Sequence, residues 1–142
     1  DIDIAWAAGL FEGEGTITIR SGGSARASRR QTEGYTRPSV TVTMTDPEPI
    51  DWLRAHWGGS LRVRSLGGHA KDAHVWYLGS TVGVSRFVNH IEPFLRTQRV
   101  QRKFALMRDY LSHKRRGSRD PEYGARMRLY LERMRELNRR GV

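Results

Sequence analysis

A chain of 142 residues with 37% hydrophobic residues can bury one modest core, so we expect a single domain over residues 1–142, with a helical extension over residues 113–142. The absence of cysteine excludes disulfides, thiolate metal sites and cysteine nucleophiles. The net charge of +10 predicts a polyanionic partner, although a basic ribosomal protein or a protein that binds anionic membranes would carry a similar charge.

The sequence shows no pattern typical of a membrane protein. It has no run of about 18 apolar residues, which a spanning helix requires. Asp1 and Asp3 stand where a signal peptide has its basic region, so we expect no secretion signal here. We therefore expect no segment that spans a membrane, and double-stranded nucleic acid rather than a membrane as the partner.

The predicted elements begin with a helix over residues 3–13, for which Asp3 is a candidate N-cap. Polar and apolar residues then alternate over residues 16–20 and again over residues 37–45, which is typical of strands with one solvated face. Residues 21–36 between them are rich in glycine, serine and arginine and predict a long, basic hairpin tip.

A second helix is predicted from Asp46 and Pro47, which suit the N-cap and the first helical position, to the break at Gly58 and Gly59. Two strands and three helices follow, over residues 61–66, 73–79, 81–95, 97–113 and 121–140. Four antiparallel strands with helices on one face make an α+β fold, and the other face of the sheet is left polar and basic.

Residues 7–15, AAGLFEGEG, carry the most informative pattern. The small residues Ala5, Gly9 and Gly13 recur every four positions on one side of the predicted helix, and this spacing lets a second helix approach closely. The acidic Glu14 then stands between two glycines at the start of the first strand. A tight helix-to-strand turn with a solvated glutamate is the simpler interpretation of these residues alone.

The same nine residues resemble the LAGLIDADG motif of homing endonucleases. Ala8, Gly9, Leu10 and Gly15 match the motif, and glutamates stand at both of its aspartate positions. The order of predicted elements over residues 4–95 is also that of the family, αββαββα. The resemblance implies a sequence-specific endonuclease that cuts double-stranded DNA at a long, near-palindromic site, as in intron homing.

Because the chain carries one motif, the resemblance implies a homodimer in which two motif helices pack together. It places Ala5, Ala8, Gly9, Glu12 and Gly13 at that interface. It also implies that the Glu14 carboxylate and the Gly13 carbonyl hold Mg²⁺, for which Mn²⁺ or Ca²⁺ can substitute in binding. No other small-molecule cofactor is expected. Glu12 matches an acidic position that the family does not require, so we interpret it as a helix-end or interface residue.

Three positions depart from the family's pattern. Gln98 stands at a lysine position, Asp46 at the position of a water-orienting glutamine, and Ile50 at an arginine position. Arg99, Arg102 and Lys103 are close enough in sequence to supply the missing charge, although a solvated helix residue or a phosphate clamp is the more common role for a lysine such as Lys103. We therefore take Gln98, Lys103 and Asp46 as auxiliary catalytic candidates, with helix capping as the alternative for Asp46.

The solvated face of the sheet is the predicted reading surface, since a β-ribbon fits the major groove and an arginine fork binds a guanine edge. The expected contacts are Thr16, Thr18, Arg20, Arg37, Ser39, Thr41, Thr43, Arg62, Arg64, His74 and Trp76, with Arg26, Arg29 and Arg30 of the hairpin tip reaching further out. The simpler alternative is the polar face of a soluble sheet, and packing in the case of Trp76, because duplex DNA hides the faces of its bases.

Two other functions fit parts of the sequence. A protein could keep the fold and lose cleavage, as an RNA-splicing maturase or a DNA-binding regulator would. Glu14 favours the nuclease, whereas Gln98 and Ile50 leave room for this alternative. A basic structural protein of a ribosome or of chromatin has no need of the acidic turn at Glu14.

Overall fold

The computed structural model describes residues 1–22, 35–115, 118 and 120–139. Its elements along the chain are α1 (Ile2–Glu14), β1 (Gly15–Ser21), β2 (Thr36–Met44), α3 (Pro47–Trp57), β3 (Ser60–Arg64), β4 (Ala73–Leu78), α4 (Thr81–Ile91), the short 3-10 helix η1 (Glu92–Phe94), α5 (Gln98–His113) and α6 (Pro121–Arg139). Most of the predicted hairpin tip, with Arg26, Arg29 and Arg30, lies outside the described residues.

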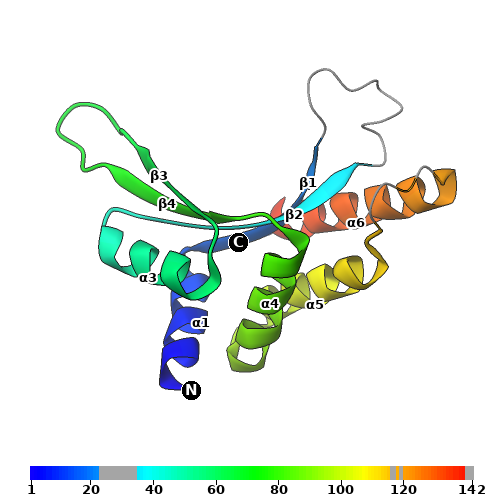
Figure 1. Cartoon of the computed structure of the whole chain (residues 1–142), viewed down its shortest axis with the longest axis horizontal. Helices are drawn as coiled ribbons and strands as arrows, with labels where there is room; N and C mark the ends of the chain where they lie inside the picture. The colour runs from blue at the N-terminus through cyan, green and yellow to red at the C-terminus, as the bar shows by residue number, and fades with distance from the viewer. Residues whose placement is uncertain (23–34, 116–117, 119, 140–142) are drawn as a thin grey trace.

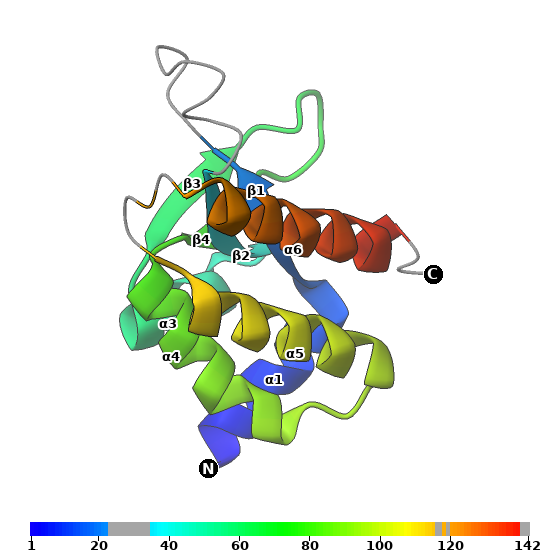
Figure 2. The ribbon, with the colours of Figure 1, turned by 90° about the vertical axis from the view of Figure 1, so that its right-hand side faces the viewer.

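The four strands form one antiparallel sheet in the order β1-β2-β4-β3. Figure 1 shows this sheet as a curved ribbon across the top of the molecule, with α1, α3, α4 and α5 beneath it. Figure 2, turned by 90°, shows α6 running beside α5 at the β1 side of the sheet. The α+β architecture predicted from the alternating patterns is therefore confirmed.

Most element ends differ from the sequence prediction by one to four residues, and for two of them the structure shows the cause. Helix α1 begins one residue earlier, because the Asp1 carboxylate, not that of Asp3, accepts hydrogen bonds from the free amides of Asp3 (2.8 Å) and Ile4 (3.4 Å). Helix α4 ends at Ile91 rather than continuing to Leu95, since Pro93 has no amide to donate and fits the tighter turn of η1.

One apolar core joins the helices to the lower face of the sheet. Phe11 of α1 lies at its centre and makes edge contacts with the rings of Phe87 and Phe104, at 5.5 and 5.3 Å between centroids. Ile4, Ala7 and Ala8 bury the same side of α1. Because this side is fixed to the core, the opposite side of α1 is left for solvent or a partner.

The outer edge of β1 is covered by α6. Asn138 donates a side-chain hydrogen bond to the Ile17 carbonyl at 3.1 Å, so part of this edge cannot pair with a strand of another molecule. The helix is anchored by its buried side chains Tyr123, Met127, Tyr130, Leu131 and Met134.

Within the described residues, no helix is both long and apolar enough to cross a membrane.

Candidate functional site

The carboxyl end of α1 presents an unengaged carboxylate. Glu14 and Gly13 are both exposed, and the Glu14 carboxylate makes no hydrogen bond or ion pair with any residue that the structure describes. The last carbonyl groups of a helix lack partners and carry the negative end of the helix dipole, and the last turn of α1 contains no basic residue. Charge and geometry therefore favour a cation at this position.

Glu12, by contrast, is fully engaged within its own chain. Its carboxylate accepts hydrogen bonds from the backbone amides of Arg96 (3.0 Å) and Thr97 (2.7 Å) and from the Thr97 hydroxyl (2.5 Å). Partial burial raises the pKa of Glu12, but these hydrogen bonds and the nearby charge of Arg96 outweigh it and lower the pKa overall. Glu12 thus joins the end of α1 to the start of α5, which fits its interpretation as a helix-end residue.

We expect the stabilisation from Glu12 to disappear in acid. Because its folded-state pKa is lowered, the charged form stabilises the fold above the ordinary value of 4.5, and this contribution is lost as the pH falls through the folded-state pKa. Glu12→Gln should cost about 1 kcal/mol at pH 7, and clearly less in acid. Urea unfolding of both proteins at several pH values measures this difference, and a difference that stays constant with pH would contradict the role of the charge.

Two of the auxiliary catalytic candidates, Gln98 and Lys103, lie on α5. Gln98 follows Thr97 directly, so the Glu12 contacts hold it close to the end of α1. Lys103 is five residues further along α5 and therefore about 140° around the helix from Gln98. It is half-buried, and burial together with the charge of Arg99 lowers its pKa. Gln98 and Lys103 consequently lie on different sides of α5.

Asp46 and Ile50 have structural roles in α3. Asp46 accepts a hydrogen bond from the Glu48 amide at 3.0 Å, which confirms it as the N-cap. Gly15, which follows Glu14, pairs with Val42, and Asp46 lies four residues after Val42. Asp46 is therefore at the same end of the sheet as Glu14. Ile50 is 1% exposed and belongs to the core, so no charge replaces the arginine at this position.

In the strands that the structure describes, the upper face of the sheet, which points away from the helices, is basic and carries no acidic residue. Arg20 on β1 pairs with Arg37 on β2, and Arg62 and Arg64 alternate along β3 on the same face. All four arginines are exposed, and none of the four strands contains an aspartate or glutamate. Thr16, Thr18, Thr41 and Thr43 share this face. The surface therefore combines positive charge with hydrogen-bonding groups, as a surface that binds DNA requires.

On β4 the predicted face is wrong by one residue. His74 and Trp76 pair with Met44 and Val42 and so turn toward the helices. Trp76 is 0% exposed and donates its indole hydrogen bond to the Gly58 carbonyl at 2.7 Å. Both faces of AHVWYL are largely apolar, so the sequence does not reveal which side is solvated. The upper face instead carries Val75 and Tyr77, which the sequence prediction missed.

Ser39 was also predicted on the exposed surface. It does face the upper side, opposite Thr18, but only 1% of it is exposed. Its hydroxyl makes no hydrogen bond to the described part of the chain. A short side chain in a central strand is covered by longer neighbours, which alternation in the sequence cannot indicate.

The free side of α1 continues from the acidic turn along the helix. Ala5, Gly9 and Gly13 are exposed on it, together with Ile2 (88% exposed) and Trp6 (45%). Ala8, which was expected at the interface, is 0% exposed and packs in the core of its own chain, because it lies on the side of Phe11. The predicted interface is therefore corrected to exclude Ala8.

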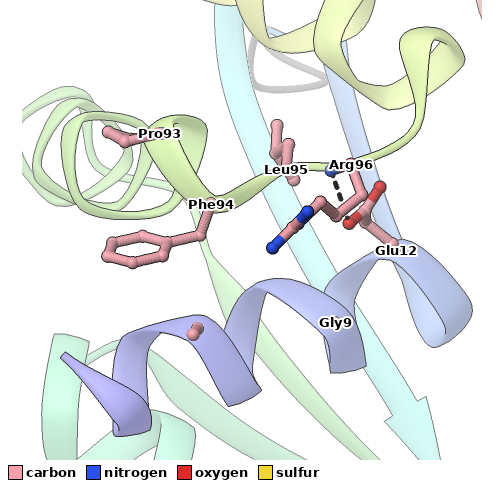
Figure 3. Close-up of a pocket in the computed structure, with 7 residues that line it drawn as sticks. Gly9, Glu12, Pro93, Phe94, Leu95 and Arg96 are labelled. Carbon is pink, nitrogen blue, oxygen red and sulfur yellow. Dashed lines mark hydrogen bonds between the residues drawn. The ribbon is translucent and has the colours of Figure 1, made fainter.

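A shallow groove of about 430 Å³ runs along this side of α1. Figure 3 shows it between α1 and the segment that follows α4, with Glu12 and Arg96 at one end joined by the hydrogen bond from the Arg96 amide. Its lining is mostly small or apolar: Ala5, Gly9, Pro93, Phe94 and Leu95. Among the described residues, no group of three histidine or carboxylate side chains could hold a metal ion within a single chain.

No protein-family model and no curated protein matches the sequence, but solved structures match its fold. The homing endonuclease I-CvuI, in complex with DNA in the presence of Mg, has a TM-score of 0.77 at 17% identity, over 96% of this chain and 82% of that one. The archaeal intron-encoded homing endonuclease I-Vdi141I, complexed with DNA, has a TM-score of 0.72 at 17% identity, over 96% and 84%. The LAGLIDADG homing endonuclease I-GzeII has a TM-score of 0.64 at 15% identity, over 93% of this chain and 43% of that one. The chain therefore has the LAGLIDADG homing-endonuclease fold, as its motif predicted.

Proposed function

We propose that the protein is a metal-dependent endonuclease that cuts double-stranded DNA at a specific, near-palindromic site as a homodimer. The observation that carries this proposal is the exposed Glu14 carboxylate, which has no partner among the described residues. It lies at the end of α1, next to the first strand of the basic sheet face. A protein that only binds nucleic acid gains nothing from an exposed acidic group there, since like charge repels phosphate. The DNA complexes of structural neighbours with this fold support the same assignment.

The exposed side of α1 supports the proposed dimer. One chain supplies one Glu14, and the described residues contain no larger ligand group, so two acidic turns need two copies. The small residues Gly9 and Gly13 let two α1 helices approach closely. The chain also covers only 43% of the length of I-GzeII, which leaves room in that protein for a second unit of this size.

We expect Gly9→Leu to disrupt this dimer without unfolding the chain. A Cβ at Gly9 meets no atom of its own chain within 4 Å, so the isolated fold has room for the side chain. A leucine on the contact side would hold the two helices apart. Light scattering should report a monomer with unchanged helical circular dichroism, whereas an active dimer of this variant would place the interface elsewhere. Ala125→Leu, on the exposed side of α6, is the matched control.

The residues at the acidic turn fit a hard cation. The Glu14 carboxylate and the Gly13 carbonyl would hold Mg²⁺ with oxygen ligands, and phosphate and water would complete its shell. When bound, the ion would supply charge neutralisation at the scissile phosphate and a more acidic water. Arg20, Arg37, Arg62 and Arg64 would bind the duplex and set its register, and Glu12 would keep the start of α5 beside the reacting groups.

The direct test is to incubate the purified chain with a randomised duplex library and Mg²⁺ and to sequence the cut ends. We expect one enriched site with two mirrored halves. Enrichment of bound but uncut duplex would favour the DNA-binding regulator, and preferential binding of structured RNA would favour the splicing factor. Uniform binding of all polyanions, with no preferred sequence, would contradict both specific functions.

A further inference from the structure

Two long side chains meet on the upper face of the sheet across its second strand. Arg20 lies on β1 and Tyr77 on β4, and β2 runs between these strands. The guanidinium carbon of Arg20 is 5.9 Å from the centre of the Tyr77 ring, at the outer limit of a cation–π contact. Of the four strand arginines that the structure describes, Arg20 alone has such a contact.

The burial of Ser39 provides independent evidence that these side chains close over β2. Ser39 lies on β2 between Arg37, which pairs with Arg20, and Thr41, which pairs with Tyr77. It points to the outer face of the sheet, away from the helices, and yet it is 1% exposed. Arg20 and Tyr77 are long diagonal neighbours of Ser39 on the two flanking strands, so a contact between them above β2 agrees with the burial of this serine.

Gly79 provides the space that the Tyr77 ring needs. A Cβ at this glycine would overlap the hydroxyl and ring carbons of Tyr77, so the ring lies along β4 and over Gly79. The backbone of Gly79 has no positive φ, and therefore space is the reason for glycine here. The ring thus lies close to the backbone of β4, within reach of the Arg20 guanidinium.

We propose that Tyr77 is a positioning residue that orients Arg20 for reading one base in each half of the DNA site. This inference rests on the proposed function. An exposed arginine loses rotamer freedom when it binds a guanine edge, and a guanidinium already held on a ring loses less. The contact with Tyr77 therefore favours the bound geometry of Arg20 over its alternatives and sharpens base preference at that position.

The test uses the full chain and the site selected from the duplex library. Arg20→Ala first identifies the base position that Arg20 reads. Tyr77→Leu should lower preference at this same position by about two- to five-fold, the range of an exposed cation–π contact. Gly79→Ala, which displaces the ring and keeps the tyrosine, should have the same effect. Tyr77→Phe keeps the ring and should retain the preference, which makes it the matched control.

A double-mutant cycle separates positioning from direct contact with DNA. Adding Tyr77→Leu to Arg20→Ala should cause no further loss at this position. An additive loss, or a loss at another position, would overturn the positioning role. In the free protein, ring-current shifts of the Arg20 side-chain protons should vanish in Tyr77→Leu, and their absence from the original protein would overturn the contact itself. If the protein selects no DNA site but shows these ring-current shifts, the proposed function and the role of Tyr77 in specificity are both refuted. The contact between Arg20 and Tyr77 would then still stand.

Discussion

Glu14→Gln should reduce the rate of DNA cleavage in Mg²⁺ by a factor on the order of 10³ or more, because it removes the charge that holds the cation without changing the size of the side chain. Binding of the selected duplex should be unchanged or slightly tighter without metal, since the carboxylate repels the phosphates of the DNA. Single-turnover cleavage of labelled duplex measures the first effect, and a titration in metal-free buffer measures the second.

Glu132→Gln is the matched control for this experiment. Glu132 is also exposed, lies on α6 in an ion pair with Arg128, and is remote in sequence from the acidic turn. It should cleave at the original rate. Full cleavage by Glu14→Gln would show that Glu14 takes no part in the reaction. Equal losses of cleavage rate in both variants would show that the change in net charge, and not the loss of a metal ligand, slows the reaction.

Trp76→Ala should lower the free energy of unfolding by about 3–5 kcal/mol, the range for an aromatic side chain removed from a packed core. Trp76 is 0% exposed and lies against Phe87, with 5.6 Å between the ring centroids. Its indole N–H donates a hydrogen bond to the Gly58 carbonyl. The substitution therefore leaves a cavity and an unpaired acceptor together. Urea unfolding followed by circular dichroism measures the change.

The neighbouring residue supplies the control for Trp76. Val75 is half-buried on the opposite face of β4, so Val75→Ala should cost about 1 kcal/mol or less. If Trp76→Ala leaves stability intact and weakens DNA binding instead, Trp76 belongs to the upper face and the pairing of Val42 with Trp76 is wrong.

The contrast between β2 and β4 explains how much of the sheet the sequence determined. In β2, threonines alternate with valines, and this difference in hydropathy identifies the buried side without further information. In β4, valine and tyrosine alternate with tryptophan and leucine, so both faces are apolar. Only pairing with β2 decides between them, because partners across a ladder share a face.

The candidate site also has some features that the sequence determined and others that only the tertiary structure decided. The nine-residue motif, the single acidic turn and the net charge of +10 predicted from the sequence alone the fold, the basic sheet surface and the place of Glu14 at the end of the first helix. They are local or compositional properties, which a sequence contains directly. Three other features depend on tertiary contacts. Glu12 is bound by Arg96 and Thr97, more than 80 residues away, and Ala8 and Ser39 are buried. Arg20 meets Tyr77 across β2. Such contacts join segments that are far apart in the chain, and only the packed structure decides which side chains remain free.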